Sequence, residues 1–222
     1  MQIQWKSPGV PIVSEPGLRA RKKAKTRATI VRVALDLFAE QGYSQTTIAQ
    51  VAEAADVSPR TVSTYFPAKE DIVFDVSSGS KERLVEAIQR RPEGQDTMAA
   101  LKEWLLEERQ VLDHDRDLHA CQRLVIDREE SLLQHEQALF REFELVLAEG
   151  LAQDLDLPPS DPKPRMAAAA AMAAFDLIHD EGHAERHEGQ IPTIEEQLDL
   201  LDQALAFING GVSALRQGRK GP

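Results

Sequence analysis

The sequence predicts an all-α protein of about nine helices, in which an N-terminal three-helix domain precedes a larger helical domain. The 222 residues are rich in Ala, Leu, Glu and Gln, which favour helices, and only 5% of them are aromatic. Apolar residues recur at helical spacing, and no segment alternates as a strand does. We therefore divide the chain into a tail over residues 1–18, a three-helix domain over 19–67 and a helical domain over 68–218.

The chain begins with a segment that has no periodic apolar face. Residues 1–18 include Pro8, Gly9, Pro11 and Pro16, which predicts a disordered tail. A long helix follows, rich in Lys and Arg in its first turns, and ends where Gly42 supplies a C-cap. Its buried stripe is expected to consist of Ile30, Val33, Ala34, Leu37 and Phe38.

Residues 46–66 are predicted to form two short helices joined by a tight turn. Thr47 and Gln50 have the spacing of a capping box at the start of the first helix. Asp56 marks the turn, because Asp tolerates the left-handed backbone that reverses the chain. The apolar stripe of the first helix is Ile48, Val51, Ala52 and Ala55.

The second helix of this pair is short and polar, and both of its ends are marked. Ser58 is placed as the N-cap and Pro59 as the first helical residue, where no amide hydrogen is needed. Because Pro67 restricts the residue before it, the helix ends at Phe66, which anchors it inward together with Val62. Hydroxyl, phenol and guanidinium groups, which suit phosphates and base edges, are left exposed on Arg60, Thr61, Ser63, Thr64 and Tyr65.

The charge of the chain is unevenly divided. From Arg19 to Lys69 there are nine basic and four acidic residues, whereas the rest of the chain holds 17 basic and 33 acidic ones. One pole of an acidic protein therefore attracts phosphates, which favours binding to a polyanion. Two alternatives, a helical hairpin in an ordinary core and a helical adaptor that binds only protein, give no reason for this basic pole.

The run from about Lys23 to Asp75 resembles the DNA-binding domain of tetracycline-repressor-like (TetR) regulators. The sequence VALDLFAEQGYSQTTIAQVAEAADVSPRTVSTYFPAKEDIV is similar to the family pattern of an aliphatic helix, a Gly-aromatic corner, Thr-x-x-x-Ile/Val-Ala-x-x-Ala-Gly-Val-Ser and Tyr-Phe-x-x-Lys-Glu. Asp56 stands where the family usually has Gly, and Ser63 and Thr64 stand where many members have aromatic residues.

The resemblance implies a homodimeric transcriptional repressor that binds a near-palindromic operator in double-stranded DNA. A small-molecule effector in the segment 68–218 would release it by moving the helix that begins near Lys69. The residues expected to contact DNA are Lys23, Lys25, Arg27, Thr47, Ser58, Pro59, Arg60, Thr61, Ser63, Thr64, Tyr65 and Lys69.

The larger domain is expected to form helices over residues 68–90, 96–113, 115–128, 129–155, 163–187 and 194–216. A Pro-Glu-Gly break lies within residues 91–94, and the proline-rich segment 157–164 is expected to be a stiff linker without helix. Thr193 and Glu196 are spaced as a capping box for the last helix. The side chains expected to face inward are Trp104, Leu105, Leu124, Leu132, Phe140, Phe143 and Leu147.

The last two helices have an apolar surface that is wider than one monomer is expected to cover. Residues 167–175 consist of small residues with Met172 and Phe175, which allows another helix to approach closely. The last helix repeats apolar residues at Leu198, Leu201, Leu205 and Ile208. We expect a four-helix homodimer interface, as the resemblance also implies. The alternative is that these helices only complete the core of the monomer.

The effector site is expected to be a mostly apolar pocket that suits an amphipathic anion or a flat aromatic molecule. Its expected lining is Trp104, Arg123, Phe140, Phe143, Phe175 and His179. An alternative uses the row of His179, His183 and His187, whose spacing would let imidazoles share a metal ion in a metal-sensing regulator.

No enzyme and no cofactor is predicted. The sequence HAERH lacks the Glu of the metalloprotease motif HExxH, and the chain has no Gly-rich phosphate loop or nucleophile elbow. The single cysteine, Cys121, is expected to be a small buried side chain. Because no apolar run reaches the length of a signal-peptide core or a membrane span, we expect a cytoplasmic protein without a membrane partner.

Overall fold

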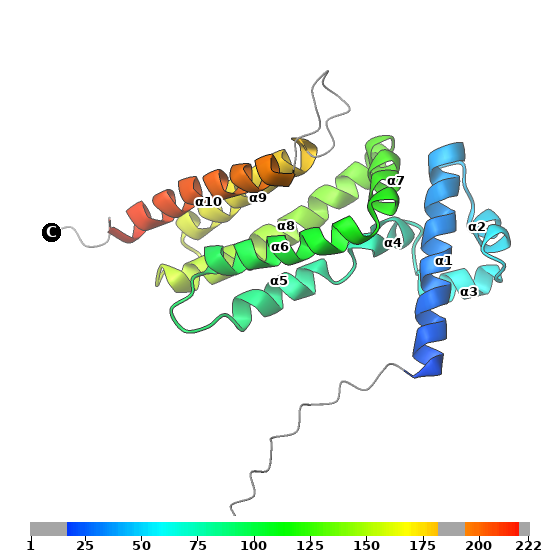
Figure 1. Ribbon diagram of the computed structural model, residues 1–222, viewed down its shortest axis with the longest axis horizontal. Coiled ribbons are helices and arrows are strands. Elements are labelled where there is room, and N and C mark those ends of the chain that lie inside the picture. The colour runs from blue at the N-terminus through cyan, green and yellow to red at the C-terminus, as the bar shows by residue number, and fades with distance from the viewer. Residues whose placement is uncertain (1–16, 182–193, 218–222) are drawn as a thin grey trace, which may run out of the picture. The chain divides into compact units, whose positions relative to one another are not determined.

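The computed structural model describes residues 17–181 and 194–217, and within these residues the chain is all-α, as predicted (Figure 1). These residues form ten α-helices and one short 3-10 helix, η1, with no strand among them. The helices are α1 (Leu18–Gln41), α2 (Ile48–Ala54), α3 (Pro59–Tyr65), α4 (Glu70–Val73), η1 (Phe74–Ser77), α5 (Ser80–Gln89), α6 (Thr97–His114), α7 (Arg116–Asp127), α8 (Glu130–Asp154), α9 (Pro162–Glu181) and α10 (Ile194–Gln217).

The chain packs as two compact units, the first ending at Val73 and the second beginning at Phe74. In the first unit, α1 packs against both α2 and α4, while α2 packs against α3. The short helix α4 therefore belongs with the first unit, although the sequence suggested a boundary after residue 67.

The long helix α1 ends where predicted, at Gly42, whose φ is +90° and whose amide donates to the carbonyl of Phe38. Its expected stripe is partly wrong, because Val33 and Leu37 are only half-buried. Because both α2 and α4 pack on α1, the buried band is rotated relative to the predicted one. The buried residues of α1 are Ile30, Val31, Ala34, Leu35 and Phe38.

The predicted α2–turn–α3 segment is confirmed in its local details. The Thr47 side chain accepts a hydrogen bond from the amide of Gln50, and the Gln50 side chain accepts one from the amide of Thr47. Asp56 has a φ of +54°, and Ser58 accepts a hydrogen bond from the amide of Thr61 as the N-cap of α3. The helix ends at Phe66, which is buried together with Val62, so α3 is anchored by two apolar side chains.

The continuous helix expected over residues 68–90 is wrong. The segment divides into α4, η1 and α5, and the break lies at Gly79, whose φ of +80° is left-handed. The preceding Ser77 and Ser78 also have modest helix propensity, so the run Ser-Ser-Gly cannot hold a helix against this turn. The indole Nε1 of Trp104 donates to the carbonyl of Ser80 at 3.1 Å and secures the new helix start.

The second unit has a core built from α5, α6, α8, α9 and α10. The helix α8 packs on α9, which packs on α10 (Figure 1). Leu205 and Ile208 of α10 are about 5% exposed and belong to this core together with Ala168 of α9. Those two apolar residues therefore complete the monomer, and their assignment to a dimer interface is wrong.

Two further expectations for the second unit are corrected. Leu124 was expected to face inward but is 40% exposed. The helix α9 begins at Pro162, inside the expected linker, because prolines are tolerated in a first helical turn and Asp161 accepts a hydrogen bond from the amide of Lys163. The capping residue Thr193 lies outside the described residues. No helix in the described part of the chain is long and apolar enough to cross a membrane.

Candidate nucleic-acid interface

The helix α3 is capped at its N-terminus by Ser58 and presents a polar surface. Ser58, Pro59, Arg60, Ser63 and Thr64 are exposed, whereas the expected contacts Thr61 and Tyr65 are half-buried. The Ser58 and Thr61 hydroxyls lie 2.8 Å apart, and the Thr64 hydroxyl donates to the carbonyl of Arg60 at 2.8 Å. These short-range hydrogen bonds hold several hydroxyl groups in defined orientations on one short helix.

A second exposed polar side chain, that of Thr47, lies at the start of α2, shortly before α3 in the sequence. Thr47 is exposed, and its hydroxyl lies 2.9 Å from the side-chain oxygen of Gln50. Because the capping box occupies this hydroxyl, the orientation of Thr47 is fixed before any partner binds.

Arg27 is tied to the end of α3. Its Nη1 donates to the carbonyl of Tyr65 at 3.0 Å, and its guanidinium carbon lies 4.3 Å from the centre of the Phe66 ring. The cation thus caps the carboxyl end of α3 and stacks on the side chain that anchors it. Arg27 was expected from the sequence to contact a phosphate, and the structure uses it to hold α3 against α1.

Lys69 is engaged in a similar way at the corner between α1 and α2. Its Nζ donates to the carbonyls of Tyr43 and Thr46, at 2.7 and 3.2 Å, and lies 4.0 Å from the centre of the Tyr43 ring. Tyr43 in turn packs edge-on against Phe38. The ammonium group expected at a phosphate therefore joins the segment before α4 to this corner.

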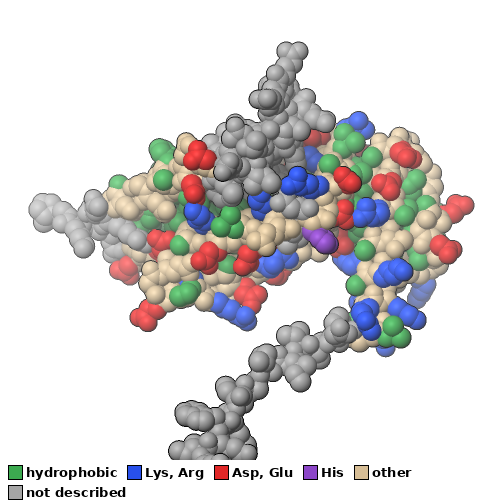
Figure 2. All heavy atoms as spheres, viewed as in Figure 1, with side chains coloured by type: hydrophobic (Ala, Val, Ile, Leu, Met, Phe, Trp, Pro, Cys, Tyr) green, Lys and Arg blue, Asp and Glu red, His purple; other side chains and the backbone are tan. Residues whose placement is uncertain are grey.

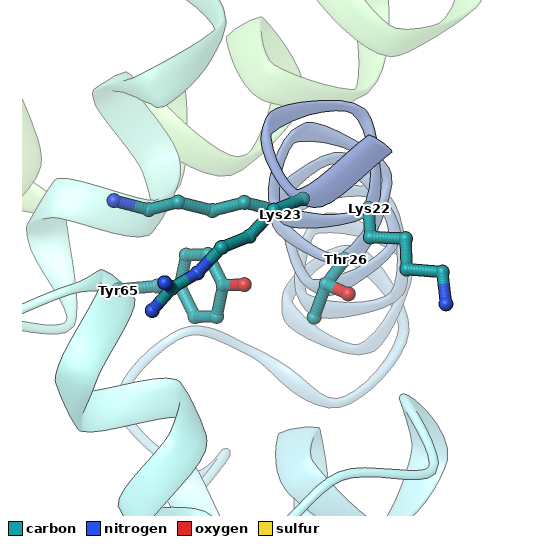
Figure 3. A pocket seen from close by; sticks show the side chains of 5 residues that line it. Lys22, Lys23, Thr26 and Tyr65 are labelled. Carbon is teal, nitrogen blue, oxygen red and sulfur yellow. The ribbon is translucent and has the colours of Figure 1, made fainter. Parts of the chain in front are cut away.

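The first turns of α1 form a hollow of about 380 Å³ together with the end of α3 (Figure 3). Its lining is Arg19, Lys22, Lys23, Thr26 and Tyr65. The sequence analysis selected Lys23 and Tyr65 but not the other three residues. Positions 19, 22, 23 and 26 nevertheless have the spacing that puts their side chains on one face of a helix. Figure 2 shows Lys and Arg side chains gathered at this end of α1, where the expected contact Lys25 is also exposed.

Of the expected effector residues, the structure brings Trp104 and Phe143 together. Their ring centres are 5.7 Å apart, and Trp104 is buried in the core of the second unit. A hollow of about 310 Å³ beside Trp104 contains no other residue of the predicted set. Its lining is Arg83, Glu86, Ala87, Arg90, Arg91, Pro92, Gln95, Glu103, Trp104 and Glu107, which is far more charged than the apolar pocket expected.

Arg123, the expected cation of the effector pocket, already has two carboxylate partners. Its Nη1 donates to Glu136 at 2.7 Å and its Nε to Asp127 at 2.9 Å, which joins α7 to α8. Burial disfavours the charged guanidinium, but the hydrogen bonds and charges of these carboxylates outweigh it and raise the pKa of Arg123. An anionic effector would have to compete with both carboxylates.

The remaining expected residues give little support to a site. Phe140 is half-buried on α8, and the side chains of Phe175 and His179 lie outside the described part of the structure, as do His183 and His187 entirely. Among the residues that are described, no group of three or more His, Cys, Asp or Glu side chains could hold a metal ion.

Comparisons with known proteins match both units. Residues 30–76 match the family model for bacterial regulatory proteins of the tetR family, and residues 95–212 match the MftR C-terminal domain. The HTH-type transcriptional regulator TcmR of Streptomyces glaucescens is 33% identical over 177 residues, which cover 75% of this chain and 76% of that protein.

Solved structures share the fold at lower identity. The SmeT–triclosan complex is 19% identical with a TM-score of 0.61, covering 82% of this chain and 91% of that one. Thermus thermophilus FadR in complex with lauroyl-CoA is 21% identical with a TM-score of 0.54, covering 83% and 94%. Together with the capped helix pair and its polar α3, the sequence matches lead to one conclusion: this chain belongs to the TetR family of DNA-binding transcriptional regulators.

Proposed function

We propose that this protein is a homodimeric repressor that binds a near-palindromic operator through α3 and leaves it when a small molecule binds the second unit. The observation that carries the proposal is the exposed polar face of a short helix whose two ends are both secured. A helix of this size fits the major groove, and two copies related by a twofold axis read two half-sites. The protein would act in the cytoplasm by binding, without catalysis.

The residues of the first unit divide into two roles in this proposal. Arg60, Ser63, Thr64 and Tyr65 of α3 contact base edges and phosphates, supported by Thr47, Ser58, Pro59 and Thr61 around the helix starts and by Lys23 and Lys25 on α1. Arg27 and Lys69 are positioning residues, because their cations already hydrogen-bond main-chain carbonyls of the same unit. Holding α3 in place in advance lowers the entropic cost of binding.

The outer faces of α9 and α10 support a homodimer. On α10, Phe207 is 81% exposed and is followed on the same face by exposed Gly210, Gly211 and Ala214. On α9, Met166 is 69% exposed and precedes exposed Ala169, Ala170 and Ala173 at the same spacing. Large apolar side chains beside small residues allow close helix packing, so we propose that a second copy covers both stripes.

In this proposal, the effector is a small molecule that binds to the second unit. TetR-fold proteins whose solved structures hold triclosan and lauroyl-CoA support a ligand that is at least partly apolar. To release the operator, the ligand must bind the DNA-free conformation more tightly, typically by about 1 to 3 kcal/mol of coupling.

A binding experiment tests the central proposal. The purified protein is mixed with fragmented bacterial DNA, the retained fragments are sequenced, and the recovered site is titrated by gel shift at several salt concentrations. We expect one near-palindromic site, bound with an affinity that falls steeply as salt rises. Retention of random fragments would contradict selection of an operator, whereas no retention of DNA at all would contradict the proposal and favour a protein-binding adaptor.

A further inference from the structure

The hollow of about 310 Å³ beside Trp104 is formed by α5, α6 and the loop between them. On α5, positions 83, 86, 87 and 90 follow the i, i+3, i+4, i+7 spacing of one helical face, and on α6 positions 103 and 107 lie one turn apart. The loop contributes Arg91, Pro92 and Gln95. Because α5 and α6 pack against each other, the hollow belongs to the second unit alone (Figure 1).

The arginines that line this hollow already have carboxylate partners. One of these partners, Asp154, has a side chain that is only 8% exposed and accepts a hydrogen bond of 2.9 Å from Nη2 of Arg91. An anionic ligand would therefore have to compete with a carboxylate at each guanidinium group. The pairs are Arg83 with Glu108, Arg90 with Glu86 and Arg91 with Asp154.

Two further carboxylates of the lining, on α6, have no such partner. Glu103 and Glu107 are exposed, and neither forms an ion pair with another described residue. The pKa of Arg83 is raised first by its hydrogen bond to Glu108 and then by the charges of Glu108, Glu82 and Glu107. The lining and its ion-pair partners together hold three arginines and five carboxylates, so the hollow favours a cation.

The side-chain amide of Gln95 adds an acceptor to the two carboxylates. Its Nε2 donates to Oε1 of Glu103 at 2.9 Å, whereas its Oε1 is buried and has no hydrogen-bond partner among the described residues. A buried acceptor without a donor is costly, so a ligand that donates to it gains more than it would at an acceptor in water. Ionised carboxylates also accept only, and all three side chains therefore select a ligand rich in donors.

The apolar part of the lining comes from Trp104 and Ala87. Trp104 is 5% exposed, and Ala87 packs against the core of the second unit. We propose that this hollow binds a small organic cation, a protonated primary amine with a short apolar group, whose ammonium group lies between Glu103 and Glu107. Its third donor reaches the Gln95 oxygen once that side chain turns slightly, and its apolar group lies against Trp104, whose ring attracts cations.

This ligand goes beyond the proposed function, because a charged lining of this kind does not suit the partly apolar effector. It would be a second small molecule of the same unit. A metal ion fits the hollow less well, since three arginines share the lining and the described residues contain no group of three or more His, Cys, Asp or Glu side chains that could hold a metal.

Calorimetric titration of the full chain with phenethylamine, which is protonated at neutral pH, tests the proposal. The control ligand is phenethyl alcohol, which has the same ring and chain length but no charge. The amine should bind and raise the midpoint of thermal unfolding, whereas the alcohol should do neither. Equal binding of the two ligands would overturn the proposal, as would no binding of the amine.

Two double variants locate the site. Glu103→Gln/Glu107→Gln removes both carboxylates of α6, and Glu93→Gln/Glu149→Gln removes two exposed carboxylates that do not line the hollow. The first variant should weaken amine binding by about tenfold or more, because charge-assisted hydrogen bonds are lost, and the second should bind as the parent does. Equal losses in the two variants would show that the amine follows net charge alone and would reject the site. Because all four side chains are exposed, both variants should remain folded.

The fluorescence of Trp104 supplies an independent measurement. In a Trp5→Phe background, Trp104 is the only tryptophan of the chain, and its emission should change with the affinity found by calorimetry. Displacement of the amine by an equal concentration of Mg²⁺ would indicate a metal site and contradict the proposal. None of these measurements uses DNA, so their failure leaves the operator proposal intact, and failure to select an operator leaves the amine site intact.

Discussion

The ammonium group of Lys69 donates a hydrogen bond of 2.7 Å to the main-chain carbonyl of Tyr43 and lies 4.0 Å from the centre of the ring of the same residue. A second hydrogen bond joins it to the carbonyl of Thr46. One cation thus satisfies two acceptors at the α1–α2 corner and fixes the segment that leads into α4. A movement of α4 would therefore disturb this corner.

Lys69→Gln should lower the stability of the protein by about 1 to 3 kcal/mol, because charge-assisted hydrogen bonds to two carbonyls are lost. Operator affinity should fall as well, with the salt slope unchanged, since no phosphate contact is removed. Denaturant unfolding and gel shifts at several salt concentrations measure the two quantities. A slope reduced by about 1 at unchanged stability would show that Lys69 contacts a phosphate. Lys81→Gln, which breaks an exposed ion pair with Glu142, is the control and should change stability less.

Arg60→Ala and Tyr65→Ala should each weaken operator binding by about 1 to 3 kcal/mol without changing the mass of the dimer. Both residues belong to α3, and Arg60 is exposed with no role in its core. Fluorescence anisotropy on a labelled operator and light scattering measure affinity and mass. Parent-like binding by both variants would mean that α3 is not the recognition helix.

Gly150→Ala should destabilise the second unit by about 1 to 3 kcal/mol through overpacking. A Cβ at this position would lie 2.7 Å from Oγ1 and 2.9 Å from Cγ2 of Thr97, which is fully buried. Thr97→Ala alone should cost little hydrogen-bond energy, because its buried hydroxyl has no hydrogen-bond partner in the structure. The double variant Gly150→Ala/Thr97→Ala should recover most of the loss in a denaturation experiment. Additive losses would show that the two sites do not touch.

Phe207→Asp should convert the dimer to a folded monomer. The side chain is 81% exposed in the single chain, so a carboxylate there leaves the core intact, whereas burying it against a second copy would be costly. Light scattering should show half the mass, and operator affinity should fall because only one half-site is bound at a time. Asn209→Asp, at an exposed α10 position outside the Phe207 stripe, adds the same charge and should remain dimeric. A dimeric Phe207→Asp variant would place the interface elsewhere.

In the α2–α3 helix pair, the features that depend only on residues close together in the sequence were predicted correctly. The Thr47–Gln50 capping box, the left-handed Asp56 and the end of α3 before Pro67 were all predicted and are confirmed. Each depends on residues within a few positions of one another, where steric limits and backbone hydrogen bonding leave few choices. The break at Gly79 was not predicted, because a single glycine is also tolerated inside a helix and its left-handed backbone is evident only in the structure.

The roles of individual cations depended on contacts that are distant in the sequence. Arg27 meets Tyr65 across 38 positions and Lys69 meets Tyr43 across 26, and neither pairing leaves a pattern in the sequence. A Lys or Arg side chain can reach a phosphate or a carbonyl equally well, so composition alone could not assign them. The same holds on α10, where Leu205 and Ile208 face the core and Phe207 faces outward.

By itself, the sequence determined the all-α fold, the ends of the helices around α3 and the family, because these follow from short-range backbone chemistry and a recognisable motif. Only the tertiary structure decided which cations are held internally, which line the hollow beside Tyr65 and which face of α10 is left uncovered. The physical reason is that helical periodicity defines a set of faces, whereas the packing of other helices selects which of those faces is buried.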